Sequence, residues 1–332
     1  MPDNPQHPFE TLTPDFILQA VEDLGYPCDG HLLALNSYEN RVYQIGLEEA
    51  EPLIAKFYRP DRWSDQQIME EHTFCYELEE QELPVVTPVL HAGKSLFYTA
   101  SEEQSFRYAL FPRRGGRAPE LDNPDNLFIL GRLLARIHRI GAARPFASRP
   151  SLDLQSFGYE PVAFVTKYFI PASLKESYCT ITDRLLERMS GLYDQFSDIR
   201  SIRVHGDCHV GNMLWRDDNP HFVDFDDTRM APAVQDIWML LSGDRAQQTT
   251  QLHEILEGYN QFHEFDPREL YLLESLRTLR LLNYSAWLAR RWDDPAFPHS
   301  FPWFNTQRYW EEQILILREQ CAALDEEPLR LM

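Results

Sequence analysis

The segment HGDCHVGNMLW at residues 205–215 constrains this 332-residue chain more than any other feature of its sequence. Asp207 precedes Asn212 by five residues, and a short apolar stretch ending at Val223 leads directly into Asp224. A single aspartate or asparagine in a loop is usually a turn former or a helix cap. Three such residues at these intervals, among short apolar pieces, instead predict a catalytic loop followed by a strand that ends at a carboxylate.

The chemistry of phosphoryl transfer needs these residue types. Magnesium is a hard cation that prefers oxygen ligands, and Asn212 and Asp224 offer a carbonyl and a carboxylate. In enzymes that transfer phosphate, an aspartate five residues before such an asparagine orients the attacking hydroxyl and accepts its proton. His205 is expected to orient this loop. The pattern therefore predicts Asp207 and Asp224 as catalytic residues, with Asn212 and Asp224 as the magnesium site.

A lysine that binds nucleotide phosphates is expected upstream of this loop. Lys56 lies in the stretch LIAKFY, whose alternation predicts a strand. About fifteen residues later, a segment with helical spacing carries Glu70 and Glu71. We choose Glu71 as the ion-pair partner of Lys56 because it shares a helical face with Phe74. In this interpretation Glu70 is a solvated surface charge.

The polar turn NSYENR at residues 36–41 occupies the position of a phosphate-covering loop. It contains neither G-x-G-x-x-G nor a Walker lysine motif. Ser37, Asn40 and exposed backbone N–H groups in this turn can still bind phosphate oxygens, so Ser37 is a candidate for the ATP site. The alternative is an ordinary polar hairpin.

The pattern of the sequence changes after Pro112. Before it, short apolar stretches predict strands at 31–35, 42–45, 53–58, 97–99 and 108–111. Helical spacing predicts helices at 14–24, with Thr13 as its N-cap, and at 66–80. After the flexible segment RRGGR, helical spacing dominates at 127–137, 181–196 and much of 247–292. We expect an N-terminal nucleotide-binding lobe at 1–112 and a helical C-terminal catalytic lobe at 113–332.

Composition and charge exclude several classes of protein. Hydrophobic residues make up 43% and charged residues 25% of the chain, which is ordinary for a globular protein. The net charge of −21 argues against nucleic acid as a partner, because the phosphate backbone would be repelled. Five scattered cysteines without C-x-x-C spacing indicate reduced thiols. The polar first ten residues indicate no signal peptide, and no apolar run approaches the ~18 residues of a membrane span. We therefore expect a cytoplasmic protein with no membrane partner.

With these residues identified, the chain resembles the bacterial stress response kinase A family, within the aminoglycoside-phosphotransferase branch of the protein-kinase-like enzymes. HGDCHVGN together with FVDFDD is specific to the branch, and PAVQDIWMLL and RRWDDPAFPHSFPW point to the particular family. The likeness covers nearly the whole chain, including LNSYENRVYQ, AKFYRPDRW, EEHTF and LGRLLARIH. The resemblance implies an α+β, bilobal protein-kinase-like fold with a small β-rich N-lobe and a large, mainly helical C-lobe.

The function implied by this resemblance is that of an ATP-dependent serine/threonine protein kinase acting in stress response. Such an enzyme transfers the γ-phosphate of Mg-ATP to protein hydroxyls, its own included. The resemblance implies Asp207 as proton acceptor, Asn212 and Asp224 as Mg²⁺ ligands, and Ser37 at the ATP site. It also matches Asp236 to an aspartate that braces the catalytic loop from below. The expected partners are ATP and proteins with serine or threonine acceptors.

Three features depart from eukaryotic protein kinases. The chain has no H-R-D, its D-F-G position reads Asp224-Phe225-Asp226, and no long activation loop precedes an A-P-E. Only about ten residues lead from Asp226 to Asp236. Switching by activation-loop phosphorylation is therefore not expected.

Three other interpretations of the same residues stay open. His205, Asp207, His209 and Asp224 could form a transition-metal hydrolase site, although the other histidines show no second cluster. A pseudokinase that acts only as a binding module would explain the missing glycine loop. A small-molecule kinase acting on choline, homoserine, a sugar or an aminoglycoside would use the same catalytic residues, because these handle ATP rather than the acceptor.

The C-terminal stretch 287–310 is rich in tryptophan, arginine, phenylalanine and proline. It could shape an acceptor site, or its aromatic side chains could anchor the last helices to the core. We favour the anchoring interpretation.

Overall fold

The computed structural model describes residues 8–100, 105–217 and 219–330, which divide into two compact units. The first unit contains the described residues through Pro119, together with those of 147–149 and 210–226. The second contains 120–146, 150–209 and the described residues from 227 onward. Residues 1–7, part of the stretch expected not to be a signal peptide, lie outside the described residues.

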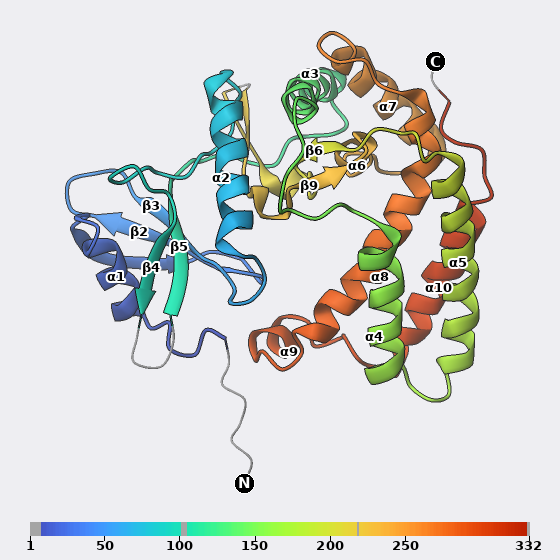
Figure 1. Ribbon diagram of the computed structural model, residues 1–332, viewed down its shortest axis with the longest axis horizontal. Coiled ribbons are helices and arrows are strands. Elements are labelled where there is room, and N and C mark those ends of the chain that lie inside the picture. The colour runs from blue at the N-terminus through green and yellow to red at the C-terminus, as the bar shows by residue number, and fades with distance from the viewer. Residues whose placement is uncertain (1–7, 101–104, 218, 331–332) are drawn as a thin grey trace. The chain divides into compact units, whose positions relative to one another are not determined.

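An antiparallel sheet of five strands dominates the first unit, in the order β1-β2-β3-β5-β4 (Figure 1). The strands are β1 (Cys28–Ala34), β2 (Arg41–Leu47), β3 (Leu53–Phe57), β4 (Phe97–Ala100) and β5 (Ser105–Pro112). The five expected strands are confirmed, with bounds that differ by a few residues. Lys56 pairs with Val42 of β2 and Ala109 of β5, so a central strand of the sheet carries this lysine.

The α-helices α1 (Pro14–Glu22) and α2 (Asp65–Glu80) belong to the first unit. The Thr13 hydroxyl accepts a hydrogen bond from the Phe16 N–H at 3.3 Å and caps α1, as its position before Pro14 predicts. Ser64 and Gln67 form a capping box at the start of α2. Both expected helices are therefore present, each begun by a capping side chain that the sequence supplies.

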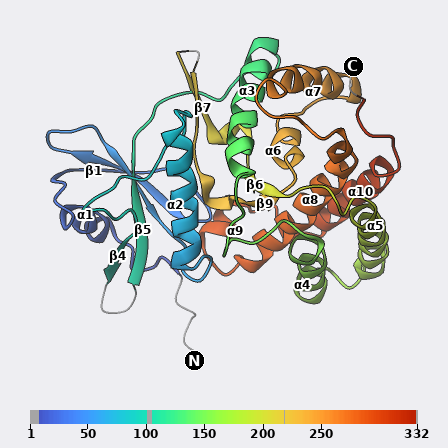
Figure 2. The ribbon, with the colours of Figure 1, turned by 45° about the horizontal axis from the view of Figure 1, so that its top comes forward.

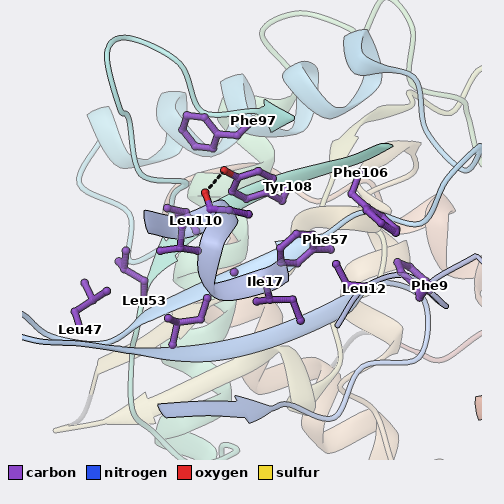
Figure 3. Close-up of a cluster of buried hydrophobic side chains, with 14 residues drawn as sticks. Phe9, Leu12, Ile17, Leu47, Leu53, Phe57, Phe97, Phe106, Tyr108 and Leu110 are labelled. Atoms are coloured by element: carbon purple, nitrogen blue, oxygen red, sulfur yellow. Dashed lines mark hydrogen bonds between the residues drawn. The ribbon is translucent and has the colours of Figure 1, made fainter. Parts of the chain in front are cut away.

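Apolar side chains of α1 and the sheet form the core that Figure 3 shows. The rings of Phe57 and Tyr108 are stacked with centroids 5.1 Å apart, and Ile17 of α1 is buried in the same cluster. The Tyr108 hydroxyl donates a hydrogen bond to the Ala20 carbonyl at 2.6 Å. Burial of each such side chain contributes about 1.5–3 kcal/mol, which fixes α1 against the strands that position Lys56.

A late segment of the chain completes the first unit. It contains η2 (Val210–Asn212), a hairpin of β7 (Met213–Arg216) and β8 (Asn219–Phe222), and the beginning of η3 (Phe225–Asp227). Phe222 exchanges backbone hydrogen bonds with the segment 84–86, accepting from the Val86 N–H at 3.0 Å. This pairing attaches the hairpin to the chain that follows α2.

The second unit is mainly helical (Figure 2). Strand β6 (Ile202–Val204) pairs with β9 (Arg229–Ala231). The helices of this unit are α3 (Pro124–Gly141), η1 (Gln155–Tyr159), α4 (Glu160–Tyr168), α5 (Lys175–Gln195), α6 (Val234–Trp238), α7 (Arg245–Tyr259), η4 (Pro267–Leu272), α8 (Leu273–Arg290), α9 (Ala296–Ser300) and α10 (Gln307–Ala323). Helix α3 packs against α7 so closely that a Cβ at Gly131 would lie 2.0 Å from the Ile255 carbonyl oxygen. The α+β class is confirmed. Within the described residues, every helix is too short or too polar to cross a membrane.

Candidate active site

A buried ammonium group lies at the centre of a polar network in the first unit. The Nζ atom of Lys56 lies 3.0 Å from Asp224 Oδ1, 3.1 Å from Asp226 Oδ1 and 3.4 Å from Glu71 Oε1. Burial alone would lower the pKa of Lys56, but the three carboxylates raise it well above its ordinary value. Lys56 is therefore held as a cation, with the side chain only 6% exposed.

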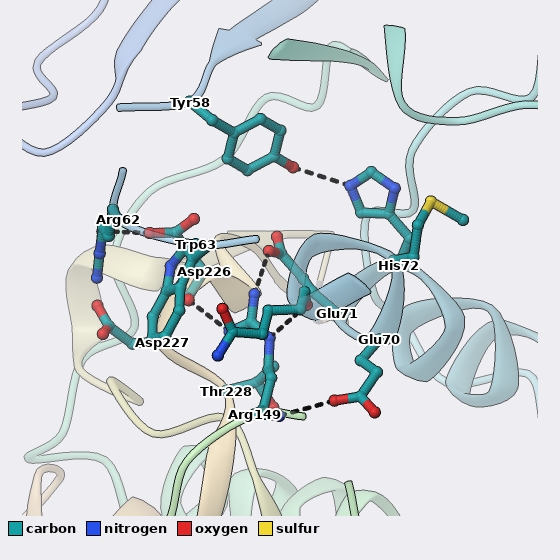
Figure 4. A network of polar contacts seen from close by, with 12 residues as sticks. Tyr58, Arg62, Trp63, Glu70, Glu71, His72, Arg149, Asp226, Asp227 and Thr228 are labelled. Atoms are coloured by element: carbon teal, nitrogen blue, oxygen red, sulfur yellow. Dashed lines mark hydrogen bonds and ion pairs between the residues drawn. The ribbon is translucent and has the colours of Figure 1, made fainter. Parts of the chain in front are cut away.

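Two adjacent glutamates of α2 have different partners (Figure 4). Besides its ion pair with Lys56, Glu71 accepts a hydrogen bond from Arg149 Nη2 at 2.8 Å. Glu70 is not a freely solvated charge, because its carboxylate accepts the backbone N–H groups of residues 147–149 at 2.8–3.0 Å. No sequence pattern singles out Arg149, which follows Glu71 by 78 residues and lies outside any helix or strand.

Asp226 is a buried carboxylate to which the sequence patterns assign no role. Arg62 Nη1 donates a hydrogen bond to Oδ2, and Lys56 lies beside Oδ1. Burial would raise the pKa of Asp226, but Arg62, Lys56 and Arg149 hold it well below its ordinary value. Three cations thus keep this carboxylate ionised inside the network.

The two predicted metal ligands flank the open end of the β7–β8 hairpin. Val223 donates its N–H to the Asn212 carbonyl at 3.0 Å, which brings Asn212 beside the residue that precedes Asp224. Asp224 has φ +58°, in the left-handed region that aspartate and asparagine tolerate better than most side chains. Its side chain is 53% exposed. Asn212 and Asp224 therefore lie at one end of a hairpin, with the carboxylate partly open to solvent.

In the second unit, a buried carboxylate fixes the backbone just before Asp207. Asp236 of α6 accepts the N–H of His205 at 2.7 Å and that of Gly206 at 2.9 Å. Gly206 has φ +85°, and a Cβ there would lie 2.2 Å from the Asp227 carbonyl oxygen. Only glycine meets both conditions without strain. The local sequence thus forces a tight turn that presents Asp207.

Two basic side chains flank the Asp207 carboxylate within the second unit. Arg280 Nη1, from α8, donates a hydrogen bond to Oδ1 at 2.6 Å, and His209 Nε2 lies 3.4 Å from Oδ2. Burial would raise the pKa of Asp207, but His209 and Arg280 hold it well below its ordinary value. Sequence spacing gave no sign of Arg280, which follows Asp207 by 73 residues.

The predicted ATP-site residue Ser37 lies in a turn with defined internal contacts. Its hydroxyl donates a hydrogen bond to the Asn40 carbonyl at 3.1 Å. The Asn40 side chain accepts the Arg59 N–H at 3.0 Å, which fixes the turn to the chain just beyond β3. Ser37 itself is half-buried.

The hydrolase interpretation requires a cluster of metal-binding side chains, formed by His205, Asp207, His209 and Asp224. Across the ranges that the structure describes, no three histidine, cysteine, aspartate or glutamate side chains are arranged to hold a metal ion. A magnesium–nucleotide site differs, because it uses one or two carboxylates together with phosphate oxygens.

Aromatic side chains of the stretch 287–310 pack against one another. Phe297 and Trp310 are fully buried. The rings of Trp287 and Phe297 lie 5.1 Å apart, and those of Phe304 and Trp310 lie 5.6 Å apart, both in edge-on contact. The first contact joins the end of α8 to α9, and the second joins the segment that follows α9 to α10, as the anchoring interpretation predicts.

Known proteins share both the sequence and the fold of this chain. The model of the phosphotransferase enzyme family matches residues 31–273. Stress response kinase A of Salmonella choleraesuis and serine/threonine protein kinase RdoA of Salmonella typhimurium are each 46% identical, over 97% of this chain and 97% of theirs. The solved structure of amicoumacin kinase hAmiN, in complex with AMP-PNP, Ca²⁺ and Ami, covers 94% of both chains with a TM-score of 0.71 at 19% identity. The expected protein-kinase-like fold is thereby confirmed.

Proposed function

The chain belongs to the phosphotransferase enzyme family, and from this premise we propose that it transfers the γ-phosphate of ATP to serine and threonine hydroxyls of proteins in a stress response. The observation that carries the proposal is the buried Lys56 ammonium, held between Glu71 and Asp224. A fixed, permanently charged amine of this kind is what binding of nucleotide phosphates requires. Relatives named as kinases of this type match nearly the whole chain, whereas the solved amicoumacin kinase shares the fold alone.

We assign the binding of the ATP phosphates to Lys56. Its raised pKa keeps it charged at physiological pH, and Glu71 fixes its position. We assign to the turn around Ser37 a part in binding the same nucleotide. The division into a nucleotide-binding lobe at 1–112 and a catalytic lobe at 113–332 remains part of this proposal.

A magnesium ion fits the donors at the end of the β7–β8 hairpin. Asn212 and Asp224 provide only oxygen ligands, and the Asp224 side chain is half exposed, with Oδ1 bonded to Lys56. These two residues would hold the ion. When bound, magnesium would neutralise charge on the phosphate oxygens.

We assign to Asp207 the role of orienting the acceptor hydroxyl and accepting its proton. Arg280 and His209 keep the carboxylate ionised, and Asp236 fixes the backbone before it. As the hydroxyl oxygen bonds to the γ-phosphorus, its proton passes to Asp207. The bond between that phosphorus and the bridging oxygen breaks, and ADP leaves with the bonding electrons.

Phosphoamino-acid analysis tests the choice of acceptor. The purified enzyme and a generic basic protein are incubated with labelled ATP and magnesium. Stable phosphoserine or phosphothreonine on either protein, absent in Asp207→Asn, is the expected result. Absence of protein label, together with rapid ATP turnover on choline, homoserine or an aminoglycoside, would assign the enzyme to small-molecule kinases. Nucleotide binding without transfer to any acceptor would identify a pseudokinase.

A further inference from the structure

Residues 147–149 hold helix α2 at two adjacent side chains (Figure 4). The backbone N–H groups of this segment bind the Glu70 carboxylate. The side chain of Arg149 binds the Glu71 carboxylate, the same group that pairs with Lys56. A short segment, distant in the sequence, therefore contacts α2 where the helix reaches the phosphate-binding lysine.

Every nitrogen of the Arg149 guanidinium donates a hydrogen bond. Nε donates to the Gln67 carbonyl at 2.7 Å, Nη1 to the Asp226 carbonyl at 2.7 Å, and Nη2 to Glu71 Oε2 at 2.8 Å. The side chain is fully buried, and the guanidinium lies 4.7 Å from the Trp63 ring centroid. Because the guanidinium is a rigid fork, these contacts fix one turn of α2 relative to the backbone at Asp226.

The charges in this network balance. Four cations, Lys56, Arg59, Arg62 and Arg149, are connected by ion pairs to four carboxylates, Glu39, Glu71, Asp224 and Asp226. Removing one partner of a buried ion pair leaves an uncompensated charge, which is strongly unfavourable. A shift of α2 that separated Glu71 from Arg149 would have this effect, so the network resists the shift.

We propose that Arg149 is a positioning residue that locks α2 in the arrangement in which Glu71 holds Lys56. This inference rests on the proposed function, since it concerns the residues assigned to the nucleotide. The lock consists of unmodified side chains and backbone. It therefore does not depend on a phosphorylated loop, in agreement with the short sequence from Asp226 to Asp236. The helix is held in position whenever the first unit is folded.

The test compares Arg149→Met with Arg149→Lys and with Arg308→Met. The lysine variant keeps the charge and loses the fork, and Arg308 is a matched control because it is an exposed arginine of α10 paired with Glu312. We expect Arg149→Met to lower kcat on the order of 10–100-fold, with a smaller change in KM for the protein acceptor. Arg149→Lys should stay within a few-fold of Arg149→Met, and Arg308→Met should match the parent. Parent-like kcat in Arg149→Met, or full recovery in Arg149→Lys, would overturn the proposal.

A double-mutant cycle separates positioning from general destabilisation. If Arg149 acts through Lys56, then Arg149→Met should add less than about threefold to the loss already caused by Lys56→Met. Multiplying losses would contradict the proposal.

Hydrogen exchange across α2 gives a readout that does not need activity. Faster exchange at residues 65–80 in Arg149→Met, and unchanged exchange in Arg308→Met, would support the lock. Should Arg149→Met fail to fold, Arg149→Lys gives the same readout, because it keeps the charge and loses the three-way fork to Gln67, Asp226 and Glu71; unchanged exchange at residues 65–80 in that variant counts against the lock. If the parent transfers no phosphate to any acceptor, the proposed function fails, and the exchange data still decide whether Arg149 holds α2.

Discussion

The networks around Lys56 and Asp207 have opposite charge arrangements. Lys56 is a cation surrounded by carboxylates and is nearly excluded from solvent, with 6% of its side chain exposed. Asp207 is a carboxylate beside Arg280 and His209, and its side chain is 24% exposed while that of Arg280 is 44% exposed. A buried charge is held by its neighbours before any ligand binds, whereas a pair open to water is weaker and easier to exchange. The difference suits a fixed phosphate-binding group in the first unit and a proton acceptor open to varied hydroxyls in the second.

The largest effect is expected from Asp207→Asn, which removes the carboxylate that we propose as proton acceptor and keeps the shape of the side chain. Transfer should fall by about 10²–10⁴-fold, because an amide cannot take the proton. ATP binding, which is assigned to the other network, should persist. Steady-state transfer assays and nucleotide titrations measure the two effects separately. Near-normal turnover would remove Asp207 from its role as base.

Asp224→Asn tests the metal assignment in the Lys56 network. Asparagine tolerates the left-handed backbone at this position, so the loss reports the carboxylate rather than strain. We expect magnesium-dependent ATP affinity to fall by about 100-fold, and excess EDTA to stop transfer by the parent enzyme. Calorimetry with and without magnesium gives the affinities. Transfer that continues without a divalent metal would contradict the mechanism.

Lys56→Met and Glu71→Gln should behave as changes to a single unit. Each should lower kcat by about 10–100-fold through misplaced phosphates, and the double variant should be little worse than Lys56→Met. Loss of one partner should also lower the free energy of unfolding by about 3–5 kcal/mol, measured by urea denaturation. Fully additive losses would show that the pair is not coupled, and a larger effect of Glu70→Gln than of Glu71→Gln would show that the Glu71–Lys56 ion pair does not position the phosphates.

The smallest effect is expected from Arg280→Met, which weakens the more exposed network. Arg280 helps to hold the pKa of Asp207 below its ordinary value, so its removal raises that pKa. Since the proposed mechanism needs the ionised Asp207 carboxylate, the acidic limb of the kcat/KM profile should move to higher pH. Above neutral pH the rate should change by no more than about fivefold, as for a surface ion pair. Arg277→Met is the matched control, because Arg277 lies on the same helix and pairs with Glu274. An unshifted limb in Arg280→Met would show that Arg280 does not influence Asp207.

Local sequence patterns predicted much of the fold. The Thr13 cap before Pro14 and the alternation around Lys56 are signals within a few residues, and the structure has a helix and a strand there. The assignment of catalytic roles to Asp207, Asn212 and Asp224 stays a prediction, although Asn212 and Asp224 do flank one hairpin.

Long-range partners could not be predicted from the sequence. Arg149 and Arg280 look like ordinary arginines, because what distinguishes them is burial and a partner more than seventy residues away. Asp226 is visible in the motif FVDFDD, but nothing local shows that its carboxylate meets both Arg62 and Lys56. Such contacts depend on how separate elements pack, which spacing along the chain does not encode.

The raised pKa of Lys56 also has a consequence for chemical labelling. Acylating reagents attack an amine that is neutral and accessible, and the Lys56 amine is buried among three carboxylates that favour its charged form. The chain has three other lysines, Lys94, Lys167 and Lys175, and all three are exposed. An amine-reactive reagent should therefore acylate these three and leave Lys56 unmodified in the folded protein. The peptide that contains Lys56 would then report, by mass spectrometry, any ligand or substitution that opens the ion-pair network.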